Sequence, residues 1–186
     1  MTTLTAIRDL MYDSFEVHRV LIVGPLRVAR DTWPEEIRKW DHLKDLTCSV
    51  VVGSVTERRR ALQKPADLYI VNRENLVWLC KNCRLDFDMV VLDELSSFKN
   101  QQAQRFKAMK ALRPKVKRIV GLTGTPSGNG LMDLWAEFRL LDMGERLGRY
   151  ISQYRNTYFQ PDKQNGMVVF SYKPLPGAED AIYKKI

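Results

Sequence analysis

Five short apolar runs, rich in β-branched residues, constrain the fold of this 186-residue chain more than any other feature. The runs lack the polar alternation of a strand with one wet face, so they suit a parallel sheet that is covered on both faces. Amphipathic helical patterns separate them, and this alternation predicts an open α/β sheet. The runs cover residues 20–24, 49–53, 68–71, 89–92 and 118–122.

Helix signals lie between and after the runs. Thr32 precedes Pro34 and Glu35, which is typical of a capped helix start, and Asn72 can cap a helix that carries Leu76. After Thr125 the pattern changes to two helices, turn signals at 160–162 and 165–166, and a strand of a small hairpin. The other predicted helices cover residues 2–12, 103–113, 131–142, 146–158 and 178–186, and the last strand covers 167–172.

The composition is basic, with 30 Lys and Arg residues against 22 Asp and Glu residues and a net charge of +8. Such a balance is compatible with a polyanionic partner, of which nucleic acid is the commonest. No apolar run approaches the ~18 residues of a membrane span, and the N-terminus has no signal-peptide pattern. We therefore expect a soluble, cytoplasmic protein that contacts no membrane. Cys80 and Cys83 lack a second ligand pair for zinc, so reduced thiols are expected.

The residues that follow the runs indicate a functional edge. In open α/β sheets ligands bind beyond the carboxyl ends of the strands, where these residues gather. Small, polar or charged side chains follow most of the runs. The segments are Gly24-Pro25-Leu26-Arg27, Gly53-Ser54, Asn72-Arg73, Asp93-Glu94 and Thr123-Gly124-Thr125-Pro126.

Asp93 and Glu94 are the strongest candidates for chemistry. A buried strand that ends in two acids fits a Walker B site, in which Asp93 orients Mg²⁺ through water on nucleotide phosphates. Glu94 would then position and deprotonate the attacking water. The hydroxyls of Thr123 and Thr125 could reach Glu94 or the water shell of the metal. The alternatives are an acidic pair that caps the next helix and an ordinary Thr-Gly turn.

A phosphate-binding loop does not accompany this site. No G-x-x-x-x-G-K-[ST] segment occurs in the sequence, and the glycine-rich G-L-T-G-T-P-S-G-N-G at 121–130 lacks the lysine. These residues therefore predict half of a nucleotide site.

Four stretches together resemble motifs Ia, Ib, II and III of the Swi/Snf-type ATPases in helicase superfamily two. They are V-L-I-V-G-P-L-R-V-A-R-D-T-W at 20–33, L-Y-I-V-N-R-E-N-L at 68–76, V-V-L-D-E-L-S-S-F-K-N at 90–100 and L-T-G-T-P-S-G-N-G-L-M-D-L-W at 122–135. The resemblance implies a RecA-like parallel sheet sandwiched by helices, the P-loop NTPase fold, over residues 1–142. A helical and hairpin extension over residues 143–186 would lead towards a second lobe.

The resemblance also implies ATP and Mg²⁺ as cofactors, and double-stranded DNA and the second RecA-like lobe of the same polypeptide as partners. In that family G-x-G-K-T lies immediately upstream of the residues that open this chain, and the arginine finger belongs to the second lobe. Both ends of the chain therefore look truncated. We expect a fragment of a DNA translocase that does not hydrolyse ATP by itself, although the intact parent protein does.

The resemblance assigns roles by position. Asp93 and Glu94 are catalytic, with Asp93 on the metal side, and Thr123, Gly124 and Thr125 couple hydrolysis to DNA. Contacts to the DNA backbone, which position a duplex without reading its sequence, fall to Pro25, Arg27, Asn72, Lys99 and Asn100. The run 58–60 of three arginines either extends that surface or is a solvated face. Motif II reads D-E-L-S where the family usually has D-E-G-H or D-E-A-H, so one contact between motifs II and III is expected to be missing.

Two other functions fit part of the same pattern. A strand-separating helicase or the motor of a restriction enzyme shares motifs Ia to III. A non-catalytic basic module that binds DNA or a protein is the alternative from another class, and it predicts that Asp93→Ala leaves function unchanged.

Overall fold

A computed structural model describes residues 1–125, 130–166 and 168–186. Residues 126–129 of the predicted motif III and residue 167, where the last strand was predicted to begin, lie outside the described residues. The predicted parallel sheet is confirmed, with strand order β2-β3-β1-β4-β5. Its five strands are β1 (Val20–Gly24), β2 (Cys48–Val51), β3 (Leu68–Asn72), β4 (Met89–Asp93) and β5 (Arg118–Leu122).

Helices connect and cover these strands, and an antiparallel hairpin follows them. The α-helices are α1 (Thr2–Arg8), α2 (Trp33–Lys39), α3 (Val55–Gln63), α4 (Leu76–Asn82), α5 (Gln104–Leu112), α6 (Met132–Leu141), α7 (Ile151–Tyr158) and α8 (Ala178–Tyr183). Two π-helical turns, η1 (Asp9–Asp13) and η2 (Val28–Thr32), and four 3₁₀ turns, η3 (Asp41–Leu43), η4 (Arg73–Asn75), η5 (Leu95–Phe98) and η6 (Arg113–Lys115), join them. The hairpin consists of β6 (Phe159–Asn165) and β7 (Val168–Pro174).

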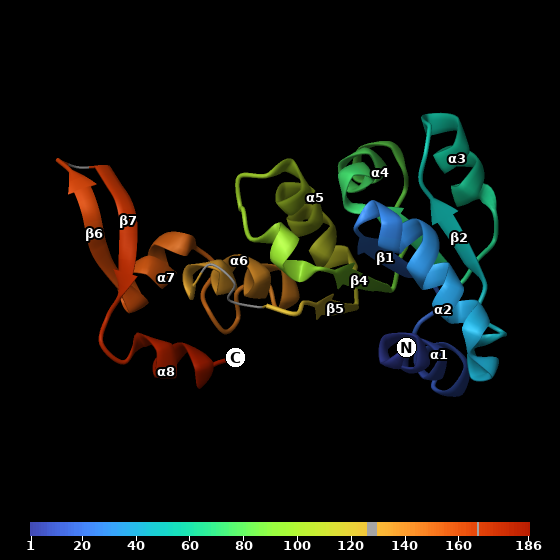
Figure 1. The fold of residues 1–186 in the computed structure, drawn as a ribbon, viewed down its shortest axis with the longest axis horizontal. Coiled ribbons are helices and arrows are strands. Elements are labelled where there is room, and N and C mark those ends of the chain that lie inside the picture. The colour runs from blue at the N-terminus through green and yellow to red at the C-terminus, as the bar shows by residue number, and fades with distance from the viewer. Residues whose placement is uncertain (126–129, 167) are drawn as a thin grey trace.

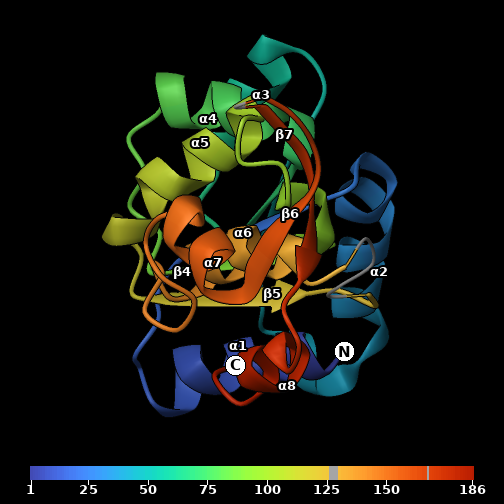
Figure 2. The ribbon, with the colours of Figure 1, turned by 90° about the vertical axis from the view of Figure 1, so that its left-hand side faces the viewer.

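The sheet has a hydrophobic core on each face, which is why its strands lack polar alternation. Leu21 and Val23 of β1 point into the core beneath α3, α4 and α5, whereas Val20 and Ile22 point into the core against α1 and α2. Figure 2 shows α3, α4 and α5 on one side of the sheet and α1 on the other. All four side chains are fully buried. Each contributes about 1.5 to 3 kcal/mol to folding, so the central strand is strongly fixed in place.

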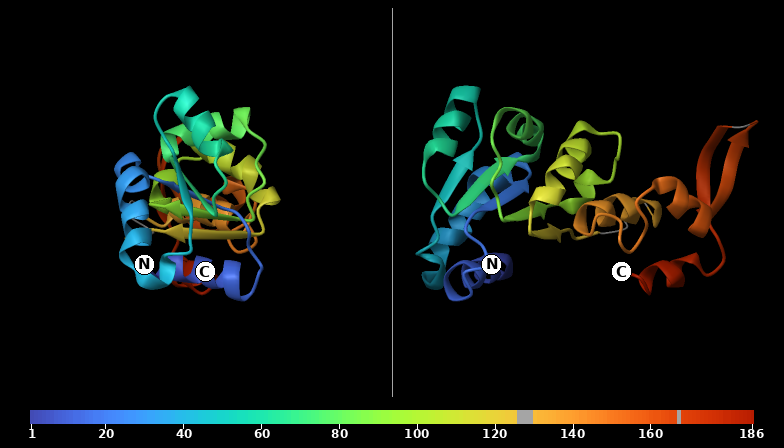
Figure 3. Two further views of the ribbon diagram at one scale, coloured as in Figure 1. Left: turned by 90° about the vertical axis from the view of Figure 1, so that its right-hand side faces the viewer. Right: turned by 180° about the vertical axis from the view of Figure 1, so that it is seen from behind.

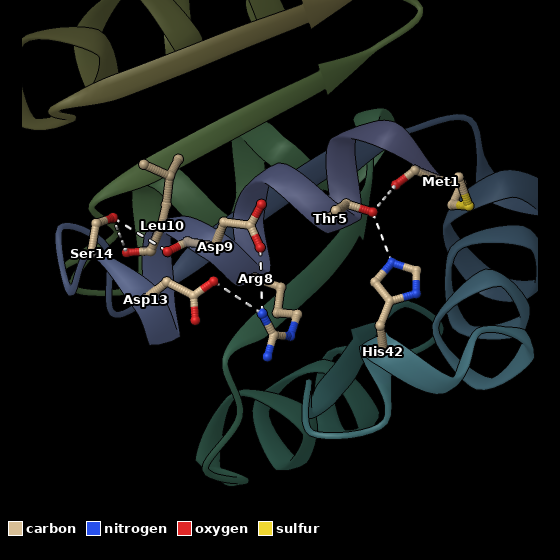
Figure 4. Close-up of polar contacts among 8 residues, drawn as sticks. All are labelled: Met1, Thr5, Arg8, Asp9, Leu10, Asp13, Ser14 and His42. Atoms are coloured by element: carbon tan, nitrogen blue, oxygen red, sulfur yellow. Dashed lines mark hydrogen bonds and ion pairs between the residues drawn. The ribbon is translucent and has the colours of Figure 1, made fainter.

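Helix α1 continues into η1, which confirms the predicted helix over residues 2–12, and polar contacts hold it at both ends (Figure 4). Thr5 Oγ1 lies 2.9 Å from His42 Nε2 of η3. Arg8 donates to Asp13 Oδ2 at 3.2 Å, and the Ser14 hydroxyl donates to the carbonyl of Asp9 at 3.3 Å. The contact with His42 ties α1 to the segment after α2, and the other two stabilise the end of α1 and η1.

Both predicted helix caps are wrong. Thr32 has helical backbone angles and makes no capping bond, because η2 leads directly into α2 and the helix has already begun. Asn72 ends β3 with an extended backbone, but its side chain bonds Glu74 and Asn75 and no backbone N–H.

The region after α6 differs from its prediction at two places. The helix predicted from residue 146 begins only at Ile151, because Gly144 and Gly148 have positive φ angles that turn the chain. The predicted turn at 160–162 is instead part of β6. Figures 1 and 3 show the hairpin at the opposite end of the molecule from β2. None of the helices in the described residues is long and apolar enough to cross a membrane.

Candidate active site

The carboxyl ends of the core strands form one edge of the sheet. The strand register places Gly24 beside Asn72 and Asp93 beside Leu122, so the segments that follow β3, β1, β4 and β5 lie next to one another. This arrangement brings the sequence-predicted Asp93, Asn72 and Thr123 to the same edge. The prediction that Thr123 follows a strand adjacent to that of Asp93 is confirmed.

Asp93 ends β4 and is held by a residue that the sequence did not single out. Trp33, which begins α2, donates its indole N–H to Asp93 Oδ2 at 2.8 Å. The Trp33 side chain is buried, so the bond fixes the carboxylate from within the protein. A Cβ atom at Gly24 would lie 3.3 Å from Asp93 Cβ. Glycine at the end of β1 therefore leaves room for the carboxylate.

Glu94 has an unusual backbone. Its φ of 61° and ψ of 62° are left-handed, a conformation that costs a non-glycine residue about 1 to 2 kcal/mol. This residue follows β4 directly and precedes η5. The Ser96 hydroxyl donates to Glu94 Oε1. Ser96 stands at the position of the usual histidine of motif II, and here that position contacts the neighbouring carboxylate.

A cavity of about 170 Å³ opens beside Asp93. Thr3, Thr32, Glu36 and Asp93 are the residues with hydroxyl or carboxylate groups among those that line it. Hydroxyl and carboxylate oxygens are ligands that suit Mg²⁺, which usually keeps several waters and shares its remaining positions with substrate phosphates. No group of three or more His, Cys, Asp or Glu side chains gathers for a metal in the described residues. The donor set thus fits an ion held by one carboxylate, water and a nucleotide.

Helix α6 adds a buried acid near Glu94 that sequence reasoning missed. Glu137 is 1% exposed, and its Oε1 has no hydrogen-bond partner among the described residues. Burial, reinforced by the charges of Asp133 and Glu94 and opposed by Lys99, raises its pKa to about 7. Lys99 itself pairs with Asp133 Oδ2 at 3.3 Å. The only sequence signal for Glu137 was an acid on the apolar face of a helix.

The predicted coupling segment begins directly after β5. The Thr123 hydroxyl accepts from the N–H of Thr125 at 3.2 Å. Within the part of the chain that the structure describes, the hydroxyl that bonds Glu94 is that of Ser96. Contact between the threonines and Glu94 is therefore not part of this geometry.

The predicted DNA contacts divide into exposed and buried residues. Arg27 is exposed after β1, whereas Pro25 and Lys99 are partly buried and Asn100 accepts from the N–H of Gln102 at 2.9 Å. Asn72 is only 6% exposed and is bonded to Glu74 and Asn75, so its side chain is committed inside the protein.

The arginine run is not a uniformly solvated face. Arg58 is buried, lies 4.0 Å from the ring centroid of Trp78 and donates to Asn75 Oδ1 at 2.9 Å. Arg59 and Arg60 are exposed. The first arginine thus joins α3 to α4, while the other two remain on the surface.

Comparison with known proteins gives consistent results. Residues 1–164 match the SNF2-related domain. The chain is 38% identical over 181 residues to protein p41 of Acyrthosiphon pisum secondary endosymbiont phage 1, which covers 93% of this chain and 39% of p41. It is 32% identical over 126 residues to Helicase ssl-1 of Caenorhabditis elegans, covering 65% of this chain and 5% of the helicase.

A solved structure shares the fold. The Sulfolobus solfataricus SWI2/SNF2 ATPase core in complex with dsDNA superposes with a TM-score of 0.72 and 27% sequence identity. The match covers 84% of this chain and 31% of the archaeal chain. The chain therefore spans well under half the length of these relatives. The five-stranded sheet with helices on both faces is the RecA-like fold of the SNF2 ATPase cores.

Proposed function

Because this chain belongs to the SNF2-related domain family, we propose that it supplies the first RecA-like lobe of an ATP-dependent translocase on duplex DNA. In this proposal residues 1–142 form the lobe and residues 143–186 extend it towards the second lobe. The observation that carries the proposal is the position of Asp93 and Glu94. Asp93 ends a buried strand and lines a cavity of about 170 Å³, and Glu94 follows it directly in the chain.

The two carboxylates have separate roles. When bound, Mg²⁺·ATP supplies a γ-phosphoryl group whose charge the metal partly neutralises. Asp93, fixed by the Trp33 indole, orients the water shell of the ion. Glu94 accepts a proton from the attacking water. The Ser96 hydroxyl, which donates to Glu94 Oε1, holds this carboxylate in place.

Hydrolysis also needs groups that cradle the phosphates and stabilise the transferred phosphoryl. The 186 residues contain no G-x-x-x-x-G-K-[ST] segment. We propose that a phosphate loop and an arginine from a facing lobe, both outside this sequence, complete the site. The chain by itself is then inactive.

The DNA contacts follow the carboxyl edge of the sheet. Arg27, Pro25, Lys99 and Asn100 contact the backbone of a duplex, and the segment 123–125 links that surface to the carboxylates. Asn72 contributes by ordering the turn after β3 and makes no phosphate contact. The solved complex of the archaeal relative with dsDNA supports a duplex as the partner.

Calorimetric titration of Mg²⁺·ATP into the 186-residue chain, with and without a short duplex, tests this proposal. We expect no binding by the chain alone and binding by the full-length protein. Binding to the chain that Asp93→Ala weakens would contradict the proposal, because the phosphates would then be held by residues within this sequence.

A second experiment separates translocation from strand separation. The full-length protein should hydrolyse ATP faster in the presence of duplex DNA and should leave the two strands paired. Displacement of a labelled strand would favour a helicase, and unchanged activity of Asp93→Ala would favour the non-catalytic module.

A further inference from the structure

Residues of α4 and α5 and of the segments that follow them line a groove of about 290 Å³. Both helices lie on the face of the sheet opposite α1 (Figure 2). Its lining is largely apolar and includes Val77, Leu85, Ala108 and Leu112. Cys80 also lines it, and burial raises the pKa of this thiol to about 11, so the sulfur stays protonated. The groove thus offers an apolar floor to the solvent.

Three lysines form the rim of this groove. Lys81, Lys107 and Lys115 are exposed, and none of them forms an ion pair with another described residue. The sequence has no Asp or Glu in 75–85 or in 99–118, the two segments that build the groove. Its positive charge is therefore not neutralised by its own helices.

A second cavity of about 360 Å³ adjoins the groove, since Leu85 lines both. Arg19, Arg59 and Arg84 line this cavity, with Asp86 as its single acid. Arg19 is paired with Asp86 and stacks over the Tyr69 ring at 4.7 Å. Arg59 and Arg84 have no ionic partner among the described residues, so the two cavities present one continuous basic surface.

Two features of this surface select the kind of occupant. The lysines and arginines of this surface would suit any polyanion, but the phosphates of DNA would leave the apolar floor of the groove without a contact. The second cavity also lies by Asp86 and Phe87, just before β4, at the edge of the sheet away from Asp93. It is therefore remote from the proposed DNA contacts at the carboxyl edge. A helix with apolar anchors and acidic flanks complements both the floor and the rim.

We propose that the groove between α4 and α5 docks an acidic amphipathic helix of a protein partner. Apolar side chains at i, i+3 or i+4 and i+7 lie on the floor. Glu and Asp side chains of the same helix face the three lysines, and its end reaches the arginines of the second cavity. The ion pairs are exposed at the rim, so binding weakens as salt screens them.

Fluorescence anisotropy tests this with a labelled synthetic helix of about 16 residues, with Leu at the anchor spacing and Glu and Ala elsewhere. We expect saturable binding to the 186-residue chain. The double variant Lys107→Glu/Lys115→Glu should weaken it by at least about tenfold, since each reversal replaces attraction by repulsion. The matched control, Lys163→Glu/Lys173→Glu on the hairpin, changes the net charge equally and should alter binding by less than about twofold.

Two further probes distinguish the groove from charge alone. A scrambled peptide of the same composition should bind much more weakly, because its leucines no longer share one face. Equal binding of the scrambled peptide, equal weakening by the hairpin control, or no binding of the designed peptide overturns the proposal. Displacement of the peptide by short duplex DNA, with the same loss of duplex binding in Lys107→Glu/Lys115→Glu, would assign the surface to nucleic acid instead. Circular dichroism confirms that each variant is folded.

Discussion

The two edges of the same parallel sheet use acidic residues in opposite ways. At the amino edge Asp67 accepts from the N–H and the hydroxyl of Thr47, at 2.7 and 2.6 Å, and from the Tyr12 hydroxyl at 3.2 Å. At the carboxyl edge Asp93 receives one indole N–H and Glu94 one hydroxyl within the described residues. A carboxylate that accepts from several protein donors holds structure, whereas one with a single donor keeps more of its lone pairs for a ligand.

Asp88, also at the amino edge, likewise has several protein partners. It accepts from the N–H groups of His18 and Arg19, at 2.9 and 3.2 Å, and pairs with Lys117 at 3.1 Å. Burial by itself would raise the pKa of Asp88, but these donors outweigh it and hold the pKa below its ordinary value. Asp88 therefore fastens the starts of β1 and β5 to that of β4.

The largest effect should come from Glu94→Gln in the full-length enzyme. The amide cannot accept a proton from water, so ATP turnover should fall by about 10²- to 10⁴-fold. The free energy of unfolding should change by less than about 1 kcal/mol, because only one hydroxyl bond is altered. Steady-state ATP hydrolysis and thermal unfolding measure the two quantities. The matched variant Asp88→Asn should lower the free energy of unfolding and leave ATP turnover unchanged. A loss of turnover comparable to that of Glu94→Gln would contradict the contrast between the two edges.

Glu137→Gln should raise stability in a manner that depends on pH. The folded protein holds the Glu137 proton up to about pH 7, whereas the unfolded chain releases it near the ordinary value of 4.5. Stability from this group is thus present below about pH 4.5 and is lost as pH rises to about 7. At pH 8 the amide should stabilise the chain by about 2 to 3 kcal/mol.

Urea unfolding of both proteins at pH 5 and pH 8 measures that difference. The gap between Glu137→Gln and the unmodified chain should be wide at pH 8 and narrow at pH 5. A gap that does not change with pH would mean that Glu137 is ionised in the folded state.

Asp67→Ala should have a smaller, purely structural effect. Alanine cannot accept from the Thr47 N–H or hydroxyl, so the bonds that converge on Asp67 Oδ2 are lost and the variant should lose about 1 to 2 kcal/mol of stability. Turnover by the full-length enzyme should be unchanged. The measurement is urea unfolding beside an ATPase assay, and reduced turnover without destabilisation would contradict a structural role.

The smallest effect should be that of Trp33→Phe, which keeps most of the buried ring and removes the single N–H that reaches Asp93. Stability should fall by about 1 kcal/mol. Turnover should fall severalfold, because Asp93 loses its only described donor. Trp135→Phe is a matched control, since its indole N–H donates to the carbonyl of Gly148 at 3.0 Å and not to Asp93. Equal turnover of the two variants would remove Trp33 from the site.

The sheet could be predicted from the sequence because strands that are buried on both faces are apolar along their whole length. Runs such as 89–92 are short and rich in β-branched residues, which favours buried strands, and the acids after them were therefore expected at the carboxyl edge. Local cap rules failed where helical geometry began early, as at Thr32, which is the last residue of η2. The turn predicted around Pro161 failed because a two-stranded hairpin has an edge that needs no N–H there.

The remaining site residues could not be predicted because they meet only through the fold. Trp33 and Asp93 are 60 positions apart, and no local pattern links an indole to that carboxylate. Glu137 gains its raised pKa from burial and from the charges of Asp133 and Glu94, which a helical pattern does not place in space. The backbone of Glu94 was likewise invisible, since left-handed geometry at a non-glycine residue has no sequence signal.

The β6–β7 hairpin has a consequence for how the molecule behaves in concentrated solution. A two-stranded sheet leaves both outer backbones open to pairing with another copy, and Phe170 on β7 is 70% exposed. Pro161 and the register shifts at Lys163 interrupt one of these edges, and Lys173 and Pro174 close the end of the other. These residues thus oppose polymerisation through the edges of the hairpin. Replacing the prolines and lysines with uncharged residues should let the edges pair with other copies and form fibres.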